Sequence, residues 1–285
     1  MSIEWKKKLD EVQMKSLQEI FEVDKPVIGM IHLAPLPGAP GYNYYEMDAI
    51  IEKALTDVKA FEEGGVNGLI VENMWDHPYY VGEEVPPEEM TAQAVAAREI
   101  IKSTDLPTGI NVIHNGGRVT LSIAVASGAD FIRVCLLTGA RVWDTGEFDH
   151  GCAAEVLRLR KNLGAEHIKI FADVDKKHSV AFPGIDLVTH IQWTKRYLAD
   201  AIIVTGKLTG IPPKLEDARK AKEAAGDTPV LVGSGASIDN VKNFLKYADG
   251  VIVGTSIKKD GVIENPVDTD RVKKFIQTVE EVRGG

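Results

Sequence analysis

Two matching stretches decide the fold: Pro229-Val-Leu-Val-Gly-Ser-Gly-Ala-Ser237 and Gly250-Val-Ile-Val-Gly-Thr-Ser-Ile-Lys258. Each is a short β-branched apolar run that stops at glycines and small hydroxyl residues. This pattern is typical of a buried parallel strand whose following turn offers backbone N–H groups to an anion. The pair therefore predicts a parallel α/β fold with two anion-binding turns.

Working outward from these runs, the chain alternates regularly between strand-like and helical patterns. Eight strand–helix repeats of short buried strands indicate a parallel sheet, and eight strands can close into a (β/α)8 TIM barrel. A doubly wound open sheet is the alternative fold. The strand-like runs are Val27–His32, Leu69–Glu72, Thr108–Val112, Phe131–Cys135, Ile168–Val174, Ala201–Thr205, Val230–Gly233 and Val251–Gly254. The helical patterns are Met47–Glu63, Pro87–Ser103, Thr120–Ser127, Ala153–Leu163, Ile185–Leu198, Lys214–Ala225, Asp239–Lys246 and Asp268–Val282.

The chain is expected to form one domain over residues 1–285. It has 285 residues, of which 44% are hydrophobic, and no linker or low-complexity tract divides it. An additional N-terminal helix is predicted within residues 1–24, and we expect it to cover the bottom of the barrel or a subunit interface of a homo-oligomer. Its apolar positions are Trp5, Leu9, Val12, Leu17, Ile20 and Phe21.

Charge and hydropathy narrow the classes of partner. The chain has 33 Lys+Arg against 42 Asp+Glu and a net charge of -9, which argues against nucleic acid or an anionic membrane as the main partner. No apolar run is long enough to span a bilayer, and the N-terminus lacks the apolar core of a signal peptide. We therefore expect a cytoplasmic protein. Cys135 and Cys152 lack metal-binding or redox spacing and are expected to be reduced.

Long loops follow the strands, whereas the connections that enter the strands are short. In a barrel, the long loops gather at the C-terminal mouth, where active sites lie. Strand alternation predicts that polar residues near the strand ends point into the barrel. The predicted inward residues are Glu72, Asp173, Asn111, Arg133, His32 and Thr205.

Acid–base chemistry requires placed carboxylates, which makes Glu72 and Asp173 the candidate catalytic acid and base. Asn111, Arg133 or His32 would then stabilise an oxyanion. In the alternative interpretation these polar residues only cap loops or pair with one another, and Arg133 with Glu72 is one such ion pair.

The two glycine turns would follow the seventh and eighth strands, where many barrels bind phosphate. The candidate phosphate-binding residues are Gly233, Ser234, Gly235, Ala236, Gly254, Thr255 and Ser256, and Lys258 is a possible additional cation. Glycine lets the backbone approach an anion closely. Alternatively, Ser237 with Asp239 or Asn240 only caps a helix, and the glycines only form tight turns.

No metal ligand is assigned, and the cofactor stays unknown. His32, Glu72, His114, Asp173 and His178 could converge at the mouth, but they lack a dedicated ligand spacing. If a phosphate is bound, oxygen-ligated magnesium is the more common choice.

Six segments resemble, in the same order along the chain, the BtpA/SgcQ family. The Met-Ile-His-Leu-x-Pro-Leu-Pro-Gly part of the first segment is the most specific. The resemblance implies a barrel of the ribulose-phosphate-binding type. The family is named for a role in photosystem I biogenesis, and other members accompany sugar-utilisation genes. The segments are Val27-Ile-Gly-Met-Ile-His-Leu-Ala-Pro-Leu-Pro-Gly38, Gly68-Leu-Ile-Val-Glu-Asn73, Gly109-Ile-Asn-Val-Ile-His-Asn115, Phe131-Ile-Arg-Val134, Phe171-Ala-Asp-Val174 and Val232-Gly-Ser-Gly-Ala-Ser237.

Three functions remain open from the sequence. The first is an enzyme that isomerises, epimerises or hydrolyses a sugar or nucleotide phosphate through the two carboxylates. The second is a non-catalytic accessory factor for photosystem I biogenesis or another protein assembly, which would bind a partner through the mouth loops or the first helix. The third is a barrel that holds the phosphate of a flavin on the same two turns.

Overall fold

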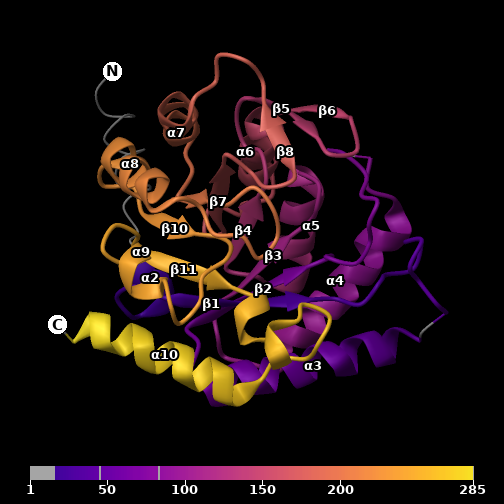
Figure 1. Cartoon of the computed structure of the whole chain (residues 1–285). Helices are drawn as coiled ribbons and strands as arrows, with labels where there is room; N and C mark the ends of the chain where they lie inside the picture. The colour runs from indigo at the N-terminus through magenta and orange to yellow at the C-terminus, as the bar shows by residue number, and fades with distance from the viewer. Residues whose placement is uncertain (1–16, 45, 83, 285) are drawn as a thin grey trace.

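The computed structural model describes residues 17–44, 46–82 and 84–284, in which eight parallel strands close into a barrel (Figure 1). The predicted TIM barrel is confirmed, and the alternative of an open doubly wound sheet is wrong, because β1 pairs with both β2 and β11. The order around the barrel is β1 (Val27–His32), β2 (Gly68–Glu72), β3 (Thr108–Asn111), β4 (Phe131–Val134), β7 (Lys169–Val174), β9 (Ala201–Val204), β10 (Val230–Val232) and β11 (Gly250–Val253).

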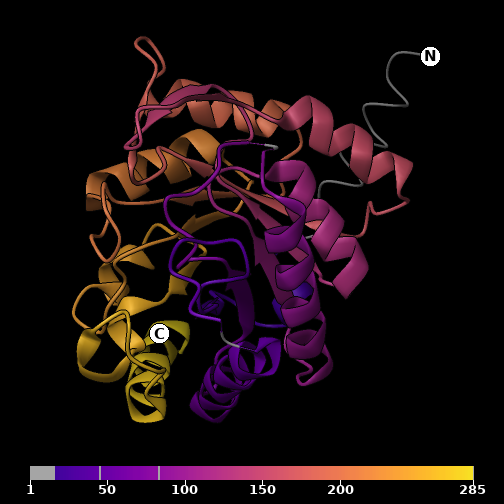
Figure 2. The same ribbon diagram turned by 90° about the vertical axis from the view of Figure 1, so that its right-hand side faces the viewer.

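Helices connect the strands and surround the barrel (Figure 2). Local sequence sets several of their ends. Asp268 accepts hydrogen bonds from the backbone N–H groups of Asp270 and Arg271 and so caps the helix that begins at Thr269. Gly65, with a φ of 85°, ends the helix that begins at Met47. The helices are α2 (Leu17–Phe21), α3 (Met47–Gly64), α4 (Pro87–Lys102), α5 (Gly117–Ser127), α6 (Ala153–Asn162), α7 (Leu187–Arg196), α8 (Leu215–Ala225), α9 (Val241–Phe244), α10 (Thr269–Arg283), and the 3-10 turns η1 (Thr255–Ile257) and η2 (Lys259–Gly261).

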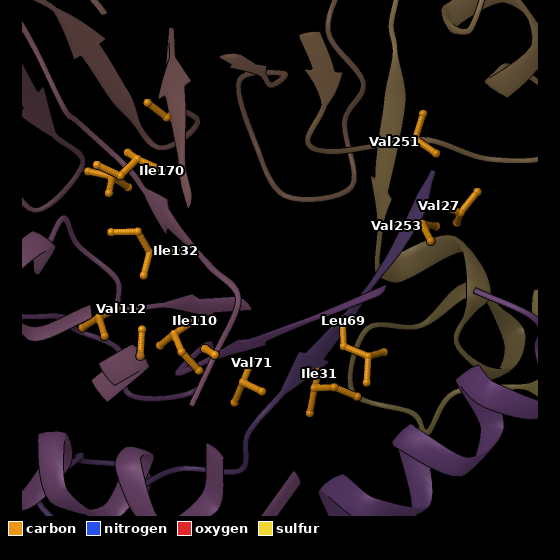
Figure 3. Packing of buried hydrophobic residues seen from close by; sticks show 14 of the residues in the cluster. Val27, Ile31, Leu69, Val71, Ile110, Val112, Ile132, Ile170, Val251 and Val253 are labelled. Atoms are coloured by element: carbon orange, nitrogen blue, oxygen red, sulfur yellow. The ribbon is translucent and has the colours of Figure 1, made fainter. Parts of the chain in front are cut away.

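Strand alternation divides the buried side chains into two layers, as the sequence predicts. The outward set packs between strands and helices, and Figure 3 shows part of it, including Ile31, Val71 and Ile132. The inward set fills the barrel below its mouth: Ile28, Met30, Ile70, Phe131, Phe171, Ala201, Ile203, Leu231 and Ile252. Because the side-chain period of a strand is two, His32, Glu72 and Arg133 share the inward face with Met30, Ile70 and Phe131.

The bottom of the barrel is filled by aromatic rings. Phe21 of α2 packs on Phe131 and Phe171, with ring centroids 5.7 and 6.3 Å apart, and Leu17 joins the same cluster. Phe21 also fills the space beside Gly68, where a methyl group would lie 2.5 Å from its ring. This end of the predicted first helix thus packs inside the barrel bottom. The rest of that prediction, residues 1–16, lies outside the described residues.

A small antiparallel sheet was not predicted from the sequence. It consists of β5 (Ala140–Trp143), β6 (Phe148–His150) and β8 (Ser179–Ala181), which lie at the top of the view in Figure 1. Two mouth loops, those that follow β4 and β7, supply these strands. The sheet therefore ties the two loops together beside the barrel mouth.

The first and last helices around the barrel lie side by side, α3 and α10, in Figures 1 and 2. Asp57 of α3 is buried here and accepts hydrogen bonds from the ammonium group of Lys258 and the backbone N–H of Val267, both at 2.8 Å. This contact joins the segment after β11 to the start of the barrel. No helix among the described residues is both long and apolar enough to cross a lipid bilayer.

Candidate active site

The ends of neighbouring strands place a layer of polar side chains at the top of the barrel interior. His32, Glu72, Asn111 and Arg133 lie at directly paired positions on β1, β2, β3 and β4. Asp173 of β7 reaches the same layer, and all five side chains are buried. The five residues that the sequence suggests for catalysis are therefore brought together.

Glu72 is the centre of one half of this layer. Its Oε2 atom accepts a hydrogen bond from the Asn111 amide, and its Oε1 atom lies 3.9 Å from His32 Nε2. Burial opposes the charge on Glu72, but Lys177 and Arg133 outweigh it and hold the pKa of the carboxyl below its usual value. Burial also lowers the pKa of His32 to about 3. At neutral pH the pair is a carboxylate beside a neutral imidazole.

Asp173 and Arg133 form the other half. Arg133 donates from Nε to Oδ2 at 2.8 Å and from Nη2 to Oδ1 at 2.9 Å, and Lys176 Nζ lies 3.5 Å from Oδ2. Burial would raise the pKa of Asp173, but the two cations lower it overall. The suggested ion pair between Arg133 and Glu72 is wrong, since the guanidinium binds Asp173.

Two lysines in the loop after β7 were missed by the sequence reasoning. Lys177 lies beside the polar layer; the residue is 9% exposed, and its backbone N–H donates to Thr205 Oγ1 at 3.0 Å. Burial lowers the pKa of Lys177 to about 8, although Glu72 opposes this effect. The signal in the sequence is a Lys-Lys pair that follows an inward Asp at a strand end by three residues.

A cavity of about 560 Å³ lies over these lysines. Tyr79 and His114 line it and contact each other at a centroid distance of 4.7 Å. The buried Trp143, which is not part of the lining, stacks on His114 at 4.2 Å. Of the aromatic residues in the mouth loops, Trp75 and Tyr79 line the cavity, whereas Tyr44 is 90% exposed. The lining is completed by Met74, His77, Pro78, Ile113, Asp144, Thr145, Lys176, Lys177, His178 and Thr209.

His178 closes one edge of the cavity. Its Nδ1 atom lies 3.1 Å from Asp144 Oδ2, and its Nε2 atom lies 2.9 Å from Thr209 Oγ1. These contacts join the loops that follow β4, β7 and β9. The cavity is therefore bounded by loops that are fixed to one another.

The two glycine turns follow β10 and β11 as expected. Within the described residues, the backbone N–H groups of residues 234–236 and 254–256 have no hydrogen-bond acceptor. The serine side chains are already engaged: Ser234 Oγ accepts from the Gly206 N–H and donates to the Ile211 carbonyl, and Ser256 Oγ donates to the Ala236 carbonyl. An anion at these turns would therefore meet backbone N–H groups.

The turns adjoin the polar layer directly. A methyl group on Gly254 would lie 3.1 Å from His32 Cε1, and one on Gly233 would lie 3.3 Å from Arg133 Nη2. Lys258, by contrast, donates to Asp57 of α3 and is not available as the additional cation that the sequence suggested. The two turns, the polar layer and the lysines thus form a continuous region at the mouth.

The loop after β9, residues 206–212, covers the turns. Thr209 lies at the cavity edge, and Gly210 lies beside Thr255, where a methyl group would come within 3.7 Å of Thr255 Oγ1. A methyl group on Gly235 would lie 2.1 Å from the Pro212 nitrogen, and Gly235 has a φ of 65°. Substitution at Gly235 would consequently displace this loop.

The five side chains considered for a metal do not converge. In the described part of the chain, no group of three or more His, Cys, Asp or Glu side chains could hold a metal ion. His32 approaches Glu72, but Asp173 binds Arg133, His114 stacks on Trp143, and His178 binds Asp144.

The architecture matches solved barrels. N-(5'-phosphoribosyl)anthranilate isomerase from Pyrococcus furiosus superimposes with a TM-score of 0.55 over 90% of this chain and 99% of that chain, at 15% sequence identity. At that identity the match shows the fold alone.

Sequence comparison identifies relatives over nearly the whole chain. An uncharacterized protein of Thermococcus kodakarensis is 44% identical over 259 residues, which are 91% of this chain and 97% of that protein. The photosystem I biogenesis protein BtpA of Synechocystis is 40% identical over 266 residues, or 93% of this chain and 91% of that protein. The BtpA family model matches residues 23–281. The chain therefore belongs to the BtpA family.

Proposed function

We propose that this barrel binds a phosphorylated small molecule at its mouth and moves a proton on the carbon skeleton of that molecule. One observation carries the proposal: two turns with unpaired backbone N–H groups directly adjoin a buried carboxylate, imidazole and guanidinium. A phosphate on the turns would place the neighbouring carbon atoms near Glu72. The phosphoribosylanthranilate isomerase that shares the fold is named for a phosphorylated substrate, which agrees with this assignment.

The phosphate would be held by several weak donors acting together. A single helix end contributes about 0.3 to 1 kcal/mol to anion binding, so one turn alone gives little affinity. Two adjacent turns add their N–H groups, and Arg133 brings a buried positive charge beside Gly233. The loop of residues 206–212 covers the turns and would exclude water from a bound phosphate.

Glu72 is the group that the geometry favours as the base. It is charged and lies beside a neutral His32 and the Asn111 amide, both of which can bind an oxygen of the ligand. Asp173 is fixed by two hydrogen bonds from Arg133, which favours a supporting role for it. Isomerisation or epimerisation next to a carbonyl needs one base with neighbouring hydrogen-bond donors, which this layer supplies. Glycoside hydrolysis needs two free carboxylates, and Asp173 is not free because Arg133 holds it.

A thermal-shift comparison tests the phosphate site. Ribose 5-phosphate, fructose 6-phosphate and the same sugars without phosphate are added to the protein, with and without magnesium. We expect the melting temperature to rise with the phosphorylated sugars only. A general screen of sugar phosphates and nucleotides then identifies the ligand that stabilises most.

Thr255→Glu provides the critical variant. It places a carboxylate at the start of η1, where it would repel a phosphate on the turns. Thr278→Glu makes the same substitution on α10 and is the matched control. Stabilisation by sugar phosphates should be lost in the first variant and kept in the second. Equal stabilisation of both variants would show that the phosphate binds elsewhere.

An accessory role in protein assembly is the second candidate, and exposed apolar side chains favour it. Phe148 and Phe182 contact each other at a centroid distance of 6.1 Å beside the small antiparallel sheet and are 57% and 51% exposed, and Val180 is 73% exposed. The Synechocystis relative is named for photosystem I biogenesis. If no phosphorylated compound stabilises the protein and Val180→Asp abolishes capture of a partner, the accessory role would be favoured over the enzymatic one.

The third function, a barrel that holds a flavin phosphate, has a simple test: a bound flavin would colour the purified protein.

A further inference from the structure

We propose that Lys177 forms an imine with a carbonyl carbon of the bound molecule, so that the substrates are phosphorylated aldehydes, ketones or keto acids. This inference rests on the proposed function of the mouth, and it adds a substrate class and a covalent step. Lys177 joins the cavity above it to the carboxylate of Glu72 beside it.

The two neighbouring lysines differ in their partners. Lys176 lies 3.5 Å from Asp173 Oδ2 and forms a buried ion pair. Lys177 has no ion pair and no side-chain hydrogen bond among the described residues, although it lines the same cavity. An amine that no carboxylate holds is available to attack a carbonyl carbon, whereas a paired amine is not.

The surroundings of Lys177 favour the reactive amine. The charged groups that face it are Glu72 of β2, Arg133 of β4, Asp173 of β7 and Lys176 in the loop after β7. Burial disfavours the ammonium form most strongly; Glu72 opposes this effect, and the two neighbouring cations reinforce it. Desolvation and a neighbouring cation are the usual means of activating a lysine for imine formation. The backbone around it is fixed, because the Lys177 N–H donates to Thr205 Oγ1 and the same hydroxyl donates to the Asp175 carbonyl.

The chemistry balances without another reactant. The lysine nitrogen bonds to the carbonyl carbon, the carbon–oxygen bond breaks, and the oxygen leaves as water. An ammonium group and a carbonyl thus become a protonated imine and one water molecule. The protonated imine withdraws electrons from the adjacent carbon, and Glu72 is then the carboxylate that removes a proton there.

Reductive trapping tests the imine. The full-length protein is incubated with glycolaldehyde phosphate and cyanoborohydride, and the modified residue is located by mass spectrometry of peptides. We expect the label on Lys177, and at least tenfold less total label in Lys177→Arg, which keeps a cation but forms no stable imine. Lys176→Met removes the neighbouring amine and should keep the label. Circular dichroism of each variant verifies that it is folded.

The outcomes separate the imine from the phosphate site. Unphosphorylated glycolaldehyde at the same concentration should label Lys177 at least tenfold more slowly. If both aldehydes label Lys177 equally, the imine stands and the phosphate site fails. If sugar phosphates stabilise the protein but the label is spread over surface lysines, or is unchanged in Lys177→Arg, the imine is wrong and the phosphate site stands.

Discussion

The Arg133 guanidinium binds the Asp173 carboxylate through two hydrogen bonds, of 2.8 and 2.9 Å, in a part of the barrel where both side chains are at most 1% exposed. Because of this pair, the two carboxylates of the mouth, Asp173 and Glu72, have different roles. Asp173 is held as a permanent acceptor, while Glu72 accepts a hydrogen bond from the Asn111 amide and lies beside the neutral imidazole of His32. Removing one partner of the pair would leave the other charge buried without its partner.

Removing the Asp173 carboxylate should lower the free energy of unfolding substantially. Asp173→Ala leaves Arg133 and Lys176 buried without the carboxylate that pairs with them, and breaking a buried pair in this way lowers the free energy of unfolding by about 3 to 5 kcal/mol. Urea unfolding measures the difference. Glu216→Ala removes a carboxylate that pairs with Arg219 on the outside of α8 and should have a much smaller effect. Similar losses in the two variants would contradict a buried pair.

Lys177 should make the stability of the protein depend on alkaline pH. Its pKa is about 8 in the folded protein and 10.5 as the ordinary value, so between these values the unfolded chain binds more protons than the folded one. The free energy of unfolding of the wild type, relative to Lys177→Met, should therefore rise from pH 8 to pH 10.5, by at most about 1.4 kcal/mol per pH unit. Chemical unfolding at several pH values measures the slope. A difference that stays constant would place the ammonium group in water.

His32 should also make the free energy of unfolding rise with increasing pH, but in the acidic range. Its pKa falls from 6.5 to about 3 on burial, so the unfolded chain binds more protons in this window. The wild type should lose stability, relative to His32→Asn, as the pH falls from 6.5 toward 4. NMR of the imidazole carbons provides an independent readout, and a titration of His32 near pH 6.5 would refute this assignment.

The contact between α3 and α10 predicts that substitutions at Gly64 and Val272 are energetically coupled. A methyl group on Gly64 would lie 2.2 Å from Val272 Cγ1, and such overpacking costs about 1 to 3 kcal/mol. The gain in helix propensity from Gly to Ala is at most about 1 kcal/mol, so Gly64→Ala should destabilise the barrel. In the background of Val272→Ala the same change should cost less, because the Cγ1 atom is gone while the contact with the Val272 Cβ atom, at 2.5 Å, remains. A double-mutant cycle by urea unfolding tests this coupling, and strictly additive effects would contradict the packing.

The barrel could be predicted from the sequence because its signals are periodic. Short apolar runs such as Val27–His32 recur between helical patterns, and the period of two in a strand decides which side chains face inward. For that reason the positions of Glu72, Asn111 and Arg133 in one layer followed from counting along each strand. The two glycine turns followed from their place after the last two strands.

The partners of the site residues could not be predicted in the same way. Lys177 lies in a loop, where no periodicity indicates which way a side chain points, and Lys258 turns toward Asp57 of a distant helix. Arg133 could reach either carboxylate of the layer, and only the geometry of the closed barrel selects Asp173. The small sheet that joins Ala140–Trp143 with Ser179–Ala181 depends on the same long-range closure.

The most direct test of the central claim is a crystal structure of the protein with the sugar phosphate that stabilises it most. We expect the phosphorus atom at the turns, with phosphate oxygens within hydrogen-bond distance of the backbone N–H groups of residues 234–236 and 254–256. The carbonyl end should then point toward Glu72 and Lys177. A phosphate bound to Lys176 and His178 in the cavity, with no ligand at the turns, would contradict the account.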